Sequence, residues 1–119
     1  MRSVMLSVAA VLWMVLPAAA QDAVKVDPAH HKVEFENEQV RVLRVTIAPG
    51  EKTAVHEHPA IVAVYLSDFT NRVSPVGGTP NETPRKAGGV ASLPATKHVV
   101  ENIGTTKAEI IVVELKGKP

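Results

Sequence analysis

Short apolar or alternating stretches, separated by turn signals, run through the chain from residue 32 onward. The stretch 39–48 is rich in Val and Ile, and β-branched residues at this density favour a strand over a helix. Pro49 and Gly50 then predict a tight turn, because Pro presets φ and Gly tolerates positive φ. We expect strands at 32–36, 39–48, 56–58, 60–66, 71–75, 82–86, 90–93, 98–102 and 107–116. Because no convincing amphipathic helix follows residue 20, this pattern predicts an all-β fold, either a small antiparallel barrel or a sandwich.

Two of the expected strands, 60–66 and 110–115, are apolar on both faces. A strand of this kind is covered on both sides, either inside a closed sheet or against a partner subunit. A single small domain has too few residues to cover both faces of both strands. We therefore predict a homodimer.

The first twenty residues have the pattern of a secretory signal peptide. Arg2 provides a short basic region, 4–16 an apolar core, and Ala18 to Ala20 a small-residue cleavage site. An uncleaved anchor helix is the alternative, since about 18 apolar residues can span a bilayer. We expect cleavage after Ala20 and a periplasmic or secreted protein. The predicted organisation is a signal peptide at 1–20, an N-terminal arm at 21–31 and a β-barrel domain at 32–119.

The charge balance after cleavage narrows the possible partners. Removing 20 of the 119 residues leaves 99, with 12 basic and 12 acidic side chains. Zero formal charge gives no electrostatic reason to bind nucleic acid or an anionic membrane. The chain has no cysteine, so an exported form cannot rely on disulfides. A small domain without net charge also has little repulsion against a second copy of itself.

Three of the five histidines lie on expected strands. His56 and His58 are two positions apart, so they project from the same face of their strand. Two such imidazoles can share a metal ion if a third ligand arrives, and His98 supplies one only if the fold places its strand beside them. His30 and His31 fall in the predicted arm, where we expect solvated side chains.

Two sequence blocks resemble the paired motifs of the cupin family. Gly50, five residues and His56-Glu57-His58 are similar to the first motif. Gly88, five residues, Pro94, then His98, three residues and Asn102 are similar to the second. The resemblance spans about 40–115. It implies a small β-barrel or double-stranded jelly roll around one metal ion, with His56, His58 and His98 as ligands and Asn102 in a turn.

The resemblance has two departures. The family's glutamate ligand falls near Val62 or Ala63, and no acid occurs between Glu57 and Asp68. In the second motif Thr96 replaces a glycine, and the spacing to His98 is one residue shorter. The resemblance therefore implies a three-histidine site or one of reduced metal affinity.

Three functions stay open at the level of sequence. The first is a metal-dependent oxygenase or an isomerase or lyase acting on a small molecule, with Fe, Zn, Cu, Ni or Mn as the divalent ion. The second is a non-catalytic periplasmic module that binds a small ligand. The third is metal carriage or buffering. The sequence identifies no catalytic residue and no organic cofactor site.

Overall fold

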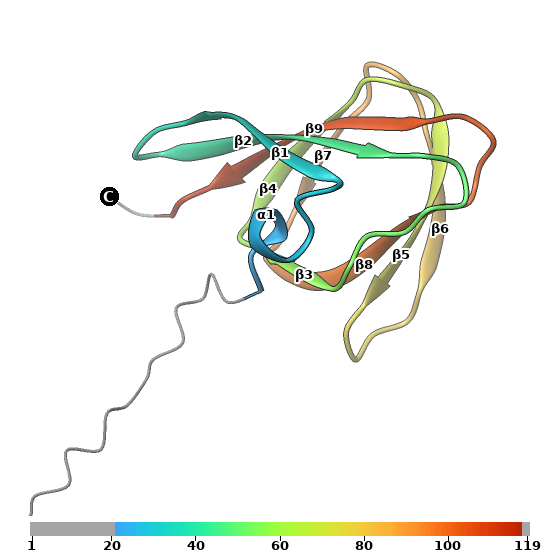
Figure 1. The fold of residues 1–119 in the computed structure, drawn as a ribbon, viewed down its shortest axis with the longest axis horizontal. Coiled ribbons are helices and arrows are strands. Elements are labelled where there is room, and N and C mark those ends of the chain that lie inside the picture. The colour runs from blue at the N-terminus through green and yellow to red at the C-terminus, as the bar shows by residue number, and fades with distance from the viewer. Residues whose placement is uncertain (1–20, 118–119) are drawn as a thin grey trace, which may run out of the picture.

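The computed structural model describes residues 21–117, and Figure 1 shows their arrangement. The predicted signal peptide at 1–20 lies outside the described residues, so the structure does not bear on it. The described elements are α1 (Ala23–Val26), β1 (His31–Glu36), β2 (Val40–Ile47), β3 (His56–His58), β4 (Ile61–Tyr65), β5 (Phe69–Pro75), β6 (Asn81–Arg85), β7 (Val90–Leu93), β8 (Thr96–Asn102) and β9 (Ala108–Leu115). Within this part of the chain no helix is long and apolar enough to cross a membrane.

The strands form two sheets that face each other (Figure 1). One sheet has five strands in the order β1-β2-β9-β4-β7, and the other has four in the order β3-β8-β5-β6. Every strand pair in both sheets is antiparallel. The prediction of an all-β fold with two such sheets is confirmed.

The period-two alternation of the sequence explains the position of the core. On β2, Leu43, Val45 and Ile47 are buried, and the residues between them are half-buried. The central strands β4 and β9 alternate in the same way, with Ala63 paired to Val112. The two runs that the sequence shows as apolar on both faces are therefore adjacent strands in the middle of the larger sheet.

The predicted turn between β2 and β3 begins as the sequence indicates. Gly50 has φ 81°, a conformation that glycine adopts without steric cost, and the Glu51 amide donates to the Ala48 carbonyl at 3.0 Å. The loop then continues to β3, held by an Asn102 amide that donates to the Glu51 carbonyl. This connection fixes the start of β3 against the end of β8.

The arm at 21–31 contains the short helix α1. Asp22 caps the four-residue helix α1 by accepting hydrogen bonds from the amides of Val24 and Lys25. Figure 1 shows α1 next to β3, and an Asp22–Glu57 β-bridge joins the two segments. The arm thus packs on the barrel. The capping hydrogen bonds and the β-bridge satisfy backbone groups of the arm there.

Candidate metal centre

Strand pairing brings the three predicted histidines together. β3 lies antiparallel to β8, with His56 directly opposite His98. The ring centroids of His56 lie 4.7 Å from those of both His58 and His98, and His58 and His98 are 5.5 Å apart. All three side chains are buried, with at most 6% of their surface exposed. The strand of His98 therefore lies beside the strand of His56 and His58, as a shared site for the three histidines requires.

The structure adds a fourth imidazole, His31, at the start of β1. The expectation that His31 is solvated is wrong, because this residue is only 3% exposed. Its ring lies 4.7 Å from that of His56 and 6.0 Å from that of His58. Ligand atoms of His31, His56 and His58 all lie within 4.8 Å of one another, a spacing that could hold a metal ion.

Asp27 explains how His31 reaches the cluster. Its carboxylate accepts the Ala54 amide at 3.0 Å, and its carbonyl accepts Nδ1 of His31 at 3.0 Å. Asp27 therefore ties the arm to the loop before β3 and orients the ring of His31. His30, the neighbour, points elsewhere and bonds the Asp27 carboxylate and Glu51. Sequence alone offered only a weak signal, a histidine directly before an alternating strand.

The outward nitrogens of three rings are already hydrogen-bonded. Nδ1 of His31 and of His56 donate to the carbonyls of Asp27 and Ala54, and Nδ1 of His58 lies 2.6 Å from Oε2 of Glu114. A neutral imidazole that donates through Nδ1 carries its lone pair on Nε2. These partners therefore leave Nε2 as the coordinating atom, the arrangement expected of histidine ligands.

The spacing across the strand pair also suits a metal ion. Nε2 of His56 lies 3.1 Å from Nε2 of His98. Two nitrogens bound at about 2.0–2.1 Å to one tetrahedral zinc ion lie about 3.3 Å apart. The imidazoles of His31, His56 and His58 fit a divalent transition metal, and His98 lies next to this group through its contact with His56.

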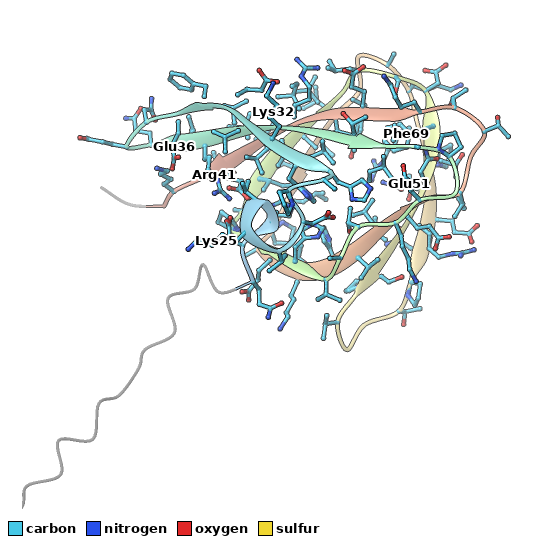
Figure 2. The ribbon with its side chains drawn as sticks, in the orientation of Figure 1. Lys25, Lys32, Glu36, Arg41, Glu51 and Phe69 are labelled. Carbon is cyan, nitrogen blue, oxygen red and sulfur yellow. The ribbon has the colours of Figure 1, made fainter. Side chains whose placement is uncertain are left out.

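A buried chain of charges supports His58 from outside the cluster. Glu114 accepts from His58 through one oxygen and from Nε of Arg41 at 2.6 Å through the other. Arg41 continues to Asp22, the cap of α1, and Figure 2 shows Arg41 beside this helix. A carboxylate that accepts from a ligand histidine fixes its tautomer and raises its basicity. Glu114 would therefore orient His58 as a metal ligand, and it does not line the cavity between the two sheets where the family's glutamate ligand would lie.

Burial sets the protonation states of the cluster. Burial, together with the charges of the neighbouring histidines, lowers the pKa of His56 to about 4 and that of His98 to about 3. Burial also lowers the pKa of His31. For Glu114, burial raises the pKa, but hydrogen bonds from His58 and Arg41 outweigh it and leave the pKa below its ordinary value. At neutral pH these histidines are thus neutral, the state in which imidazole binds metal.

A cavity of about 320 Å³ extends from the histidines between the two sheets. All four clustered histidines line it, and its walls are mostly apolar side chains of the core. No carboxylate among the described residues lines it, which agrees with the glutamate missing from the first motif. A second, wider groove of about 760 Å³ borders His58 and Glu114 on the other side, but none of the other clustered histidines reaches it. The cavity between the sheets is therefore the candidate ligand site at the cluster.

Asn102 has the structural role that the resemblance implies. Its Nδ2 donates to the carbonyls of Ile47 and Thr106, and its Oδ1 accepts from the Gly104 amide. The side chain is completely buried. It joins the ends of β2 and β8 and holds the turn before β9.

Comparison with solved structures places this architecture among known folds. The chain is similar to a cupin domain from Bordetella pertussis Tohama I, with a TM-score of 0.67 and 24% identity over 73% of this chain and 92% of that one. It is also similar to an RmlC-like cupin family protein with a double-stranded β-helix fold from Methanocaldococcus jannaschii, with a TM-score of 0.58 and 19% identity over 71% and 79%.

An oxalate decarboxylase is a further structural neighbour. The two share a TM-score of 0.55 and 25% identity over 72% of this chain, which spans 26% of the larger protein. In contrast to these structural similarities, no protein-family model matches the sequence, and no curated protein matches it. The relationship is therefore visible mainly in the fold.

Proposed function

Because the chain has the cupin fold, the double-stranded β-helix, we propose that it is exported, binds one divalent transition metal ion in the barrel and acts on a small molecule there. His56, His58 and His98 are the proposed core ligands. His31 takes the fourth position, which a glutamate occupies in the first motif of the family. The observation that carries the proposal is the convergence of buried imidazoles whose outward nitrogens are already bonded.

The donor set suits some metals better than others. Imidazole nitrogen suits Zn, Cu, Fe and Ni, while Mg and Ca prefer oxygen. Because imidazole binds metal as a neutral ligand, four histidine ligands leave the charge of a divalent ion uncompensated in the cavity. An anionic group of the small molecule is therefore expected to bind nearby.

The residues of the chain provide the setting for the reaction. The bound metal would supply Lewis-acid or redox chemistry. The backbone carbonyls and Glu114 hold the rings in one orientation, and the apolar walls limit water around the ligand. Oxygenase chemistry and isomerase or lyase chemistry are the two classes proposed for this site.

A non-catalytic binding module, for a small ligand or for the metal itself, is the second candidate. It is favoured by the cavity lining, which within residues 21–117 includes no carboxylate that could act as a general base. The measurement that separates the two is turnover. Dioxygen uptake or product formation with a panel of phenols, thiols and keto acids supports the enzyme, and stoichiometric metal without turnover supports the module.

Elemental analysis of untagged protein tests the metal site directly. We expect about one metal ion per chain in the wild type and large losses in His56→Ala and His98→Ala. His31→Ala should retain metal with weaker affinity, because three ligands remain. His30→Ala is the matched control, since this histidine lies outside the cluster, and it should keep full occupancy. The absence of metal in the wild type and after titration with zinc, copper, iron and nickel would refute the proposal.

A further inference from the structure

Arg85 is set apart from the other arginines that the structure describes. Arg41, Arg44 and Arg72 each form ion pairs with two carboxylates. Arg85, at the end of β6, has no such partner among residues 21–117, and its Nε is buried without a hydrogen bond. A buried donor without a partner costs stability unless something else satisfies it. This guanidinium is therefore suited to an anion from outside the described chain.

Asn71 on β5 is a buried polar side chain beside Arg85, and its unpartnered atom is an acceptor. The residue is 5% exposed, and its Oδ1 is buried without a hydrogen-bond partner in the described part of the chain. Phe69 pairs with Arg85 and Asn71 with Thr83, so Asn71 and Arg85 are diagonal neighbours on the inner face of the smaller sheet. Diagonal neighbours lie about 7–8 Å apart at Cα, within reach of a long side chain.

Both residues line the cavity that also contains the four histidines. The guanidinium of Arg85 lies over the ring of Tyr65, with its carbon 4.7 Å from the ring centroid. Tyr65 in turn packs edge-on against Phe69 at 5.8 Å. These rings hold the guanidinium in place without neutralising its charge.

The strand register separates this polar pair from the histidines. His98 is opposite Pro75 on β5, and Asn71 lies four residues along the same strand. Four residues of a strand span about 13 Å. Between the two ends the walls are apolar, with Val73, Val100 and Ile110 among the lining residues. The cavity thus has a cationic end, an apolar middle and an imidazole end.

We propose that Arg85 and Asn71 form a carboxylate-binding end of this cavity, so that the ligand is a small organic acid with an apolar body. The carboxylate accepts hydrogen bonds from the guanidinium and from Nδ2 of Asn71, the donor atom of this amide. The apolar body lies along the middle of the cavity and points its other end at the histidines. A volume of about 320 Å³ restricts the ligand to a small acid. This inference names the ligand class of the proposed function. It depends on the proposed function only for the role of the histidine end of the cavity.

Binding of matched acids and amides tests this end of the cavity. Benzoate and hexanoate are titrated against benzamide and hexanamide by calorimetry or ligand-observed NMR. Charge-assisted hydrogen bonds lead us to expect the acids to bind about tenfold or more tighter than the amides. Arg85→Gln should remove this preference, and Arg85→Lys should keep part of it. Arg72→Gln is the control, because this arginine lies on the surface, and it should bind like the wild type.

A second variant covers the case in which Arg85→Gln does not fold. Asn71→Asp keeps the shape of the side chain and places a negative charge beside Arg85, so it should weaken acid binding about tenfold or more. Equal binding of acids and amides, wild-type binding by folded Arg85→Gln or Asn71→Asp, or no binding by either acid would overturn the proposal.

Each titration is run on zinc-loaded protein and on chelator-treated protein. If the metal site is wrong but the carboxylate end is right, the dependence on Arg85 persists after chelation. If the carboxylate end is wrong, metal stoichiometry is unaffected and the acid preference is missing in both forms. The two failures are therefore distinguishable.

Discussion

Nδ1 of His58 lies 2.6 Å from Oε2 of Glu114, although 56 residues separate them in the sequence. Both side chains are almost fully buried, at 5% and 3% exposed. The contact joins β3 of the smaller sheet to β9 of the larger one. It links a proposed metal ligand to the buried ion pair of Glu114 and Arg41, so the two sheets determine the orientation of the imidazole together.

The first prediction concerns this contact. Glu114→Gln removes the charge that holds His58 while preserving the shape of the side chain. We expect metal affinity to fall about tenfold to a hundredfold. The free energy of unfolding of the chelator-treated protein should fall by about 1–3 kcal/mol, because Arg41 loses a charged acceptor.

Zinc titration and urea denaturation provide the two measurements for Glu114→Gln. Glu109→Gln is the control, because Glu109 pairs with the more exposed Arg44 and should change stability by less than about 1 kcal/mol. Unchanged zinc affinity in Glu114→Gln would show that His58 does not depend on this carboxylate.

The second prediction concerns the arm. Asp27→Ala removes the acceptor of the Ala54 amide and loosens the segment that orients His31. We expect a loss of about 1–2 kcal/mol in the free energy of unfolding. Zinc affinity should also decrease, approaching that of His31→Ala. Glu51→Gln removes the charge of an exposed partner of His30 and keeps an oxygen that can accept the Ala48 amide, so it should leave both quantities unchanged. If Asp27→Ala binds zinc with wild-type affinity, the arm is not part of the metal site.

The third prediction is the pH dependence of stability in chelator-treated protein. The pKa values of His56 and His98 are depressed to about 4 and about 3, so between these values and about 6.5 the unfolded chain binds more protons than the folded one. Stability contributed by the neutral rings is therefore fully present above about pH 6.5 and is lost as the pH falls toward 4 and then 3. His98→Asn should flatten this slope. Urea denaturation at a series of pH values measures it, and equal slopes in both proteins would contradict the assignment.

The fourth prediction is self-association through the outer face of the larger sheet. Val62 and Val113 are cross-strand partners there, as are Val64 and Ile111, and all four are only half-buried. Val42 extends the same apolar row on β2. We expect a homodimer at micromolar concentration in sedimentation velocity experiments, because a second copy would cover this face.

Val113→Asp should shift the dimer to monomer, since it would bury a charge in the interface. Val76→Asp is the control, because Val76 is 59% exposed and lies in the turn after β5. A wild-type protein that sediments only as a monomer would refute the homodimer.

The fifth prediction is export. Expression of the full chain should give a product in the periplasmic or secreted fraction that begins at Gln21, and mass spectrometry of the intact protein identifies this terminus. Replacing Leu12 and Val15 with Asp should block export, because it interrupts the apolar region. A mature protein that keeps Met1 would support the alternative of an uncleaved anchor.

The sequence by itself determined the class of fold and the pair of histidines on β3. Period-two alternation decides which residues of a strand face the same side, so His56 and His58 and the inward residues of β2 could be predicted locally. The resemblance to the two cupin motifs added His98 and the absence of the glutamate, and the fold comparison confirms the architecture that it implied.

Only the tertiary structure decided which distant residues complete the site. His31 enters the cluster because Asp27 folds the arm against the loop before β3, and Glu114 meets His58 because the two sheets face each other. Arg85 is distinguished from the other arginines by its lack of a carboxylate partner within the described residues, which no local pattern reveals. Contacts of this kind depend on strand order and register between segments far apart in the chain. Side-chain periodicity carries information only about neighbours on the same strand, so the sequence could place the first two histidines but not their surroundings.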